Sequence, residues 1–122
     1  MKERVSAEEQ LVVELYTSTF RQSVEFYCRW GFEIARDEGD FAELRWETSL
    51  LFIEEVTNAA PPAREIGNIR IMVEDVDRYW DMAISSGALI IRPIADRYYG
   101  LRDFTIGGPD GLGLRFASRI CS

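Results

Sequence analysis

Residues 98–116 have the sequence YYGLRDFTIGGPDGLGLRF. Within it, residues 107–111 combine a proline, which restricts one φ angle, with an Asp-Gly pair that tolerates positive φ, so they predict a tight turn. The residues after the turn alternate, so that Leu114 and Phe116 point to one face and Arg115 to the other. The stretch therefore predicts a β-hairpin, and we expect the face that carries Arg115 to line a pocket.

The sequence also contains an internal repeat. Thr19 and Gly31 bound one predicted helix, and Asp75 and Gly87 bound a second helix 56 residues later. Thr19 is followed three residues later by a glutamine, which is a capping-box pattern. Because random helices would seldom share a cap, an apolar stripe and a glycine stop at one offset, the repeat predicts two modules of the type strand–helix–three strands. The corresponding apolar pairs are Phe20 with Val76, Val24 with Trp80, and Tyr27 with Ala83.

Alternation and turn residues give the extents of the modules. Two prolines in residues 57–65 exclude a sheet there, so this segment is predicted to be a linker. We predict a single α+β domain over residues 1–122, with one module at about 10–56 and the other at about 66–118. The predicted strands are 10–16, 32–37, 41–46 and 50–55 in the first module, and 68–73, 88–92 and the two hairpin strands in the second, with a loop at 93–97.

Composition excludes several classes of function. The 122 residues include 14 Lys and Arg against 21 Asp and Glu, a net charge of −7, which argues against nucleic-acid binding. The charged N-terminal segment has neither a signal-peptide nor a membrane-span pattern. Two cysteines do not form a disulfide framework, so a reducing cytoplasm is the expected location. Histidine is absent, which removes the commonest general base and transition-metal ligand.

The hairpin also carries a family resemblance. Aromatic-Gly-x-Arg-x-Phe at 99–104, then x-Pro-Asp-Gly at 108–111 and an alternating strand, resembles the end of a vicinal oxygen chelate domain. That superfamily includes glyoxalase I, bleomycin-resistance proteins and extradiol dioxygenases, and the bleomycin-resistance-like branch is the most similar. The resemblance covers roughly residues 10–117. It implies two paired βαβββ modules that form a curved sheet around a cavity, and a homodimer; module exchange between chains stays open.

The resemblance also locates the metal ligands of the metal-dependent members. The corresponding positions here are Val12, Glu54, Asn68 and Arg115. Val12 has no donor atom, and the fixed positive charge of Arg115 would repel a dication. Two oxygen donors do not make a catalytic transition-metal site. We therefore predict no metal, no cofactor and no catalytic residues.

Alternation assigns other side chains to the pocket. We expect Glu54 to pair with Arg115, and Glu14 with Arg70. Trp46 shares a strand face with Ala42 and Leu44. The sequence therefore predicts two roles for Trp46 equally well, packing in the core and stacking on a ligand. The predicted ligand-binding residues are Glu14, Trp46, Phe52, Glu54, Asn68, Arg70, Tyr99, Arg102 and Arg115.

The function predicted from these features is reversible sequestration of an aromatic or planar cationic small molecule, as in antibiotic resistance. Aromatic walls with a few placed charges suit such a ligand. One alternative is a lyase, isomerase or dioxygenase of the same fold with a degenerate or unusual metal site that uses Glu54. Another is a regulatory or accessory dimer whose pocket is filled.

Overall fold

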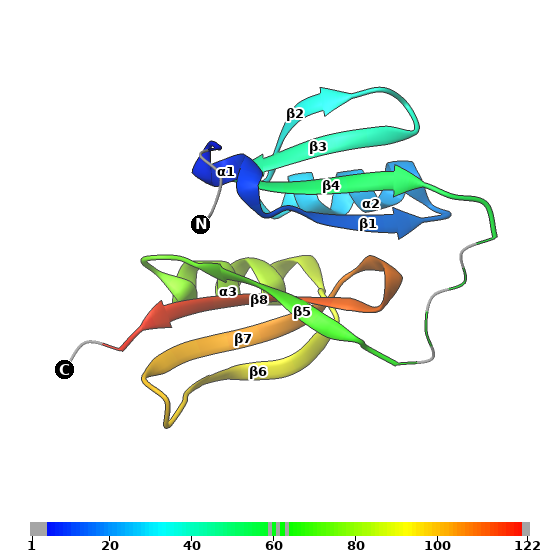
Figure 1. The fold of residues 1–122 in the computed structure, drawn as a ribbon. Coiled ribbons are helices and arrows are strands. Elements are labelled where there is room, and N and C mark those ends of the chain that lie inside the picture. Colours follow the sequence, from blue (N-terminus) through cyan, green and yellow to red (C-terminus); the bar gives the residue numbers. More distant parts are fainter. Residues whose placement is uncertain (1–4, 59, 61, 63, 121–122) are drawn as a thin grey trace. The chain divides into compact units, whose positions relative to one another are not determined.

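The computed structural model describes residues 5–58, 60, 62 and 64–120, and the chain divides into two compact units between residues 60 and 61 (Figure 1). Each unit holds one four-stranded mixed sheet with a helix packed on it. This architecture confirms the predicted α+β class and the repeated module. The division falls inside the predicted linker, whereas the single-domain organisation stays a prediction.

The first unit contains a sheet with strand order β1-β4-β3-β2, in which β1 runs parallel to β4. Its first strand begins at Val13, so the prediction of a strand from Gln10 was wrong. Glu8 and Glu9 lie in the first turn of a short helix, where negative charge is favourable. The elements are α1 (Ala7–Gln10), β1 (Val13–Thr17), α2 (Phe20–Arg29), β2 (Glu33–Asp37), β3 (Phe41–Trp46) and β4 (Ser49–Glu55).

The second unit repeats this topology with strand order β5-β8-β7-β6 and β5 parallel to β8. The predicted hairpin is formed by β7 and β8. At its turn Asp110 and Gly111 both have positive φ, of 62° and 79°, as the Asp-Gly pair indicated. The elements are β5 (Gly67–Met72), α3 (Val76–Ser86), β6 (Ile90–Asp96), β7 (Leu101–Gly107), the 3-10 turn η1 (Pro109–Gly111) and β8 (Leu112–Arg119).

Strand β6 is longer than predicted, because it continues through Pro93 into the segment expected to be a loop. Proline lacks an N–H donor, but β6 is the edge strand of its sheet and pairs only with β7. The register between the two strands shifts on both sides of Arg92, where the ladder is irregular. The edge position and the irregularity together accommodate the proline.

Each helix covers one face of its own sheet. In α2 the predicted stripe of Phe20, Val24 and Tyr27 is buried. In α3, Tyr79 stacks on Phe116 with ring centroids 4.6 Å apart, and Trp80 meets Phe104 edge-on. Within the described ranges of the chain, no helix has the length and apolarity needed to cross a membrane.

The two helix starts are capped in different ways. Asp75 accepts a hydrogen bond from the backbone N–H of Arg78, as predicted. Thr19 makes no side-chain cap, so the capping box predicted there is not formed. Instead, Oγ1 of Thr17 at the end of β1 accepts from the N–H of Thr19 and lies 3.1 Å from the hydroxyl of Ser23. The hydroxyl of Thr17, two residues before Thr19, therefore takes the place of the predicted cap.

The end of α2 leads to a stability prediction. Gly31 has φ of +122°, and a Cβ atom there would lie 2.7 Å from the Trp46 ring. Gly31→Ala therefore adds a clash to the backbone strain and should lower the free energy of unfolding by about 2–4 kcal/mol in urea titrations.

Gly39→Ala is the matched control, because Gly39 also has positive φ, of +89°, but open space around it. It should cost only the strain, about 1–2 kcal/mol. Equal losses for the two variants would show that the Trp46 contact contributes nothing.

Candidate functional site

The face of the second sheet that α3 leaves uncovered carries the candidate site. Register pairs Asn68 with Gly113 and Arg70 with Arg115, so these side-chain positions share one face. A recess of about 410 Å³ lies on this face. Its lining residues are Arg70, Met72, Tyr99, Leu101, Arg115 and Arg119.

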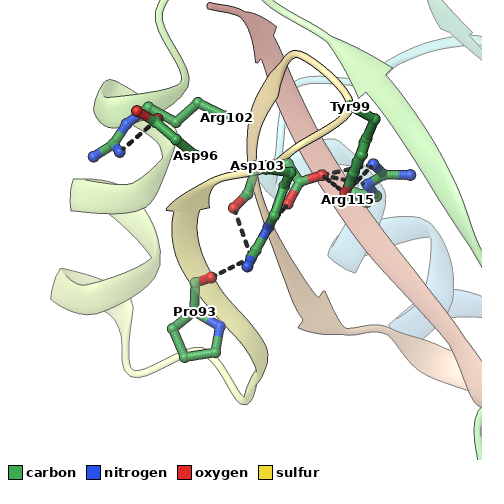
Figure 2. Close-up of polar contacts among 7 residues, drawn as sticks. Pro93, Asp96, Tyr99, Arg102, Asp103 and Arg115 are labelled. Atoms are coloured by element: carbon green, nitrogen blue, oxygen red, sulfur yellow. Dashed lines mark hydrogen bonds and ion pairs between the residues drawn. The ribbon is translucent and has the colours of Figure 1, made fainter.

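Beside the recess, a buried carboxylate organises the polar side chains. The side chain of Asp103 on β7 is fully buried. Its Oδ1 accepts from Nε of Arg97 at 2.8 Å, and its Oδ2 accepts from Arg115 at 2.6 Å and from the Tyr99 hydroxyl at 2.8 Å (Figure 2). We refer to these four residues as the Asp103 cluster. Because every acceptor contact comes from a charged or hydroxyl donor, the carboxylate is well stabilised without water.

The electrostatics of the cluster follow from these contacts. Desolvation by burial raises the pKa of Asp103, but hydrogen bonds from Arg97, Arg115 and Tyr99 lower it by more. The net pKa of Asp103 is therefore below its ordinary value. The carboxylate is negative at neutral pH and binds both guanidinium groups.

The cluster also fixes the two residues that it presents to the recess. The Tyr99 hydroxyl donates to Asp103 and accepts from Arg115 at 3.1 Å. The Arg115 guanidinium also lies 5.6 Å from the centroid of the Tyr99 ring, at cation–π range. A side chain held by several contacts loses little further freedom when a ligand binds, so Tyr99 and Arg115 form a preorganised wall.

Arg102 does not belong to this wall, although the sequence grouped it with Tyr99 and Arg115. Its guanidinium binds Asp77 on α3 at 3.0 Å and Asp96 on β6 at 3.1 Å. Figure 2 shows Arg102 and Asp96 on the other side of β7 from Tyr99 and Arg115. Hydrogen bonds to Asp77 and then Asp96 raise the pKa of Arg102. The residue ties the helix to its sheet, and its assignment to the pocket is corrected.

In the first unit, the predicted residues are divided between the two sheet faces. Register pairs Glu14 with Phe52, and alternation along β4 puts Glu54 on the same face, away from α2. Trp46 lies on the opposite face with Leu44, and its ring meets Phe32 edge-on at 5.4 Å. Core filling therefore accounts for Trp46, and its assignment to the pocket is corrected.

Sequence reasoning missed the central residue of the site. Asp103, Arg97 and Arg119 were not among the predicted site residues, and Arg115 was paired in prediction with Glu54 of the other unit. The Glu54 pairing stays a prediction, as does that of Glu14 with Arg70. The available signal was a carboxylate in mid-strand, where aspartate is disfavoured unless something binds it.

The residues that the resemblance aligns with metal ligands do not form a metal-binding donor set. Val12 offers no donor atom, and Arg115 is bound to Asp103 in a charge-assisted contact. In the part of the chain that the structure describes, no three His, Cys, Asp or Glu side chains come together as a possible metal site. No mechanism through a metal is therefore derived.

The fold and site define a two-module α+β protein with an open, arginine-lined sheet face. The sequence profile of the Glyoxalase/Bleomycin resistance protein/Dioxygenase superfamily matches residues 10–116. The chain belongs to this superfamily, which confirms the resemblance. A search of curated protein sequences finds no match.

Solved structures agree with this fold. A glyoxalase/bleomycin resistance protein/dioxygenase from Nocardioides has a TM-score of 0.77 at 19% identity, over 96% of this chain and 87% of its own. The bleomycin resistance determinant encoded on transposon Tn5 has a TM-score of 0.73 at 19% identity, over 93% and 99%. A bleomycin-binding protein complexed with bleomycin has a TM-score of 0.68 at 19% identity, over 92% and 99%. At such identities the likeness shows the fold alone.

Removing the charge of Asp103 should destabilise the fold. Asp103→Asn leaves Arg97 and Arg115 close together without their shared counter-charge, and should reduce the free energy of unfolding by about 3–5 kcal/mol at pH 7. Asp96→Asn is the matched control, because Asp96 is 61% exposed in its pair with Arg102. Its loss should be about 1 kcal/mol or less.

The stability difference between the wild type and Asp103→Asn should also depend on pH. The folded-state pKa of Asp103 lies below its unfolded value of about 3.9, so its stabilisation is complete above that pH and is lost as pH falls through the folded pKa. The stability difference between the wild type and Asp103→Asn should therefore shrink as pH falls below about 4. A constant difference down to about pH 2 would mean that Asp103 is not the titrating group.

Proposed function

We propose that this chain binds a small aromatic molecule reversibly in the recess of the second unit and sequesters it without chemical change. The observation that carries the proposal is the recess of about 410 Å³ beside a preorganised aromatic ring and guanidinium group. That volume is in the range of small-molecule sites. Similarity to a bleomycin resistance determinant and a bleomycin-binding protein supports a binding role.

The charge of the ligand needs revision. The sequence predicted an aromatic or cationic ligand, but the described residues that line the recess include three arginines and no carboxylate side chain. A cation would therefore be repelled there. We keep the aromatic part of the prediction and leave out the positive charge. A role in antibiotic resistance, a homodimer and a cytoplasmic location remain parts of the proposal.

The aromatic wall gives a direct test with naphthalene-2-carboxamide, a neutral planar probe. Tyr99→Ala removes the ring and should weaken binding about tenfold in calorimetric titrations, because aromatic contacts of this kind contribute about 1.5 kcal/mol. Tyr99→Phe keeps the ring and should lose less. The recovered probe should be chemically unchanged by mass spectrometry.

Tyr98→Ala is the control, because Tyr98 is adjacent in sequence and fully exposed. It should leave the affinity within about twofold. Equal affinities for the wild type and Tyr99→Ala would contradict the proposed wall, and a converted probe would favour an enzyme of the same fold.

Metal titration separates the binding role from the enzymatic alternative. A specific site at about 100 times its dissociation constant should add roughly 2.7 kcal/mol, which raises the melting temperature of a chain this size by about 3–6 °C. We expect no such shift when Ni²⁺, Zn²⁺, Mn²⁺ or Fe²⁺ is added to metal-stripped protein. A rise of that size in melting temperature with one metal would favour the enzymatic alternative over the binding role.

A further inference from the structure

The recess is lined by three arginines, and Asp103 beside it binds only one of the three. We propose that it binds the oxyanion of an aromatic acid, a carboxylate or a phosphate, and that Arg70 and Arg119 contact that anion. This inference rests on the proposed function and specifies the ligand class of the same site. It reverses the sign of the ligand charge that the sequence predicted.

Two arginines lie side by side on this face of the sheet. Arg70 on β5 and Arg115 on β8 are directly paired across parallel strands, so their side chains leave the sheet on the same face. Like charges in directly paired positions are destabilising. The Asp103 carboxylate accepts from Nε and Nη2 of Arg115, and it also accepts from Nε of Arg97. An anion bound beside Arg70 would reduce the repulsion between Arg70 and Arg115 that Asp103 alone does not cancel.

The local charge balance also favours an anion. The Asp103 cluster contains two guanidinium groups and one carboxylate, and Arg70 and Arg119 add two further positive charges. Counted over the Asp103 cluster and the recess lining alone, four positive charges and one negative charge give a net charge of +3. The whole chain carries −7, so the positive recess is not a consequence of overall composition.

The guanidinium groups of Arg70 and Arg119 are available to donate hydrogen bonds to a ligand. Among the described residues of the second unit, none forms an ion pair with Arg70 or Arg119, and both are exposed. Arg119 also borders a neighbouring depression lined by Glu74, Asp75, Asp77 and Asp96; Asp77 and Asp96 bind Arg102, and Asp75 accepts from the N–H of Arg78. Arginine presents its donors in a planar fork that matches a carboxylate or phosphate.

The lining of the recess also has an apolar part. Met72 and Tyr99 are 38% and 40% exposed, and Leu101 forms part of the same wall. A fully hydrated inorganic anion would gain nothing from these side chains. An acid with a flat apolar body would use both the guanidinium groups and the wall.

Four probes with one ring system test the inference by calorimetry at pH 7. They are naphthalene-2-carboxylate, 2-naphthyl phosphate, naphthalene-2-carboxamide and 2-naphthylmethylammonium. We expect at least one anion to bind about tenfold or more tightly than the carboxamide, and the ammonium probe to bind most weakly. The tighter anion identifies the oxyanion class. The advantage of the anion should shrink as salt rises from 0.05 to 0.5 M, because exposed charges are screened.

Variants assign the effect to its residues. Arg70→Gln and Arg119→Gln should each reduce the affinity for the tighter anion about tenfold and leave the carboxamide affinity within about twofold. Arg78→Gln makes the same charge change on α3 and should alter neither affinity. Amide shifts in two-dimensional NMR should map the bound anion to β5 and β8.

The outcomes separate the two proposals. If all four probes bind equally well, or if Arg78→Gln weakens the anion as much as Arg70→Gln, the oxyanion site is overturned while small-molecule binding stands. If the carboxamide binds and both anions bind more weakly, the sign of the ligand charge is wrong. If no probe binds the folded wild type at millimolar concentration, the proposed function fails together with this inference.

Discussion

The longer helix of each unit packs on one face of its sheet, and the rest of this structure follows from that constraint. Helices α2 and α3 have ten and eleven residues, and the first unit also holds the four-residue helix α1, which contacts β4. On the covered face the sequence supplies Phe104, Phe116 and their counterparts in the first unit. On the other face it supplies charged and aromatic side chains, and strand alternation keeps the two sets of side chains apart.

Asp103 converts that surface into an ordered site. A fully buried carboxylate is tolerated only when it is paired and hydrogen-bonded, and here two of its partners, Tyr99 and Arg115, line the recess. The same contacts engage Arg115, which the family resemblance aligns with a metal ligand of the metal-dependent members. The chain therefore has the fold of the superfamily, and at that position it places an arginine bound to a buried carboxylate.

The distribution of charge also changes how the ligand is viewed. A net charge of −7 suggests a preference for cations. The recess itself is lined by guanidinium groups, an aromatic ring and apolar side chains. Charges at contact distance outweigh screened charges elsewhere on the surface, so the local arrangement of charge weighs more than the total charge in the proposed site.

The sequence by itself determined the two-module α+β architecture, the hairpin turn, the helix stripes and the family, because these depend on local periodicity, caps and glycines that act within a few residues. It could not determine that β6 continues through Pro93, which depends on β6 being an edge strand. Only the tertiary structure decided that Trp46 and Arg102 lie on the helix-covered faces, since their positions follow from strand register and from partners such as Asp77, 25 residues from Arg102. It also decided that Arg97, Tyr99 and Arg115 meet on Asp103, because a buried charge selects its partners in space and not along the chain.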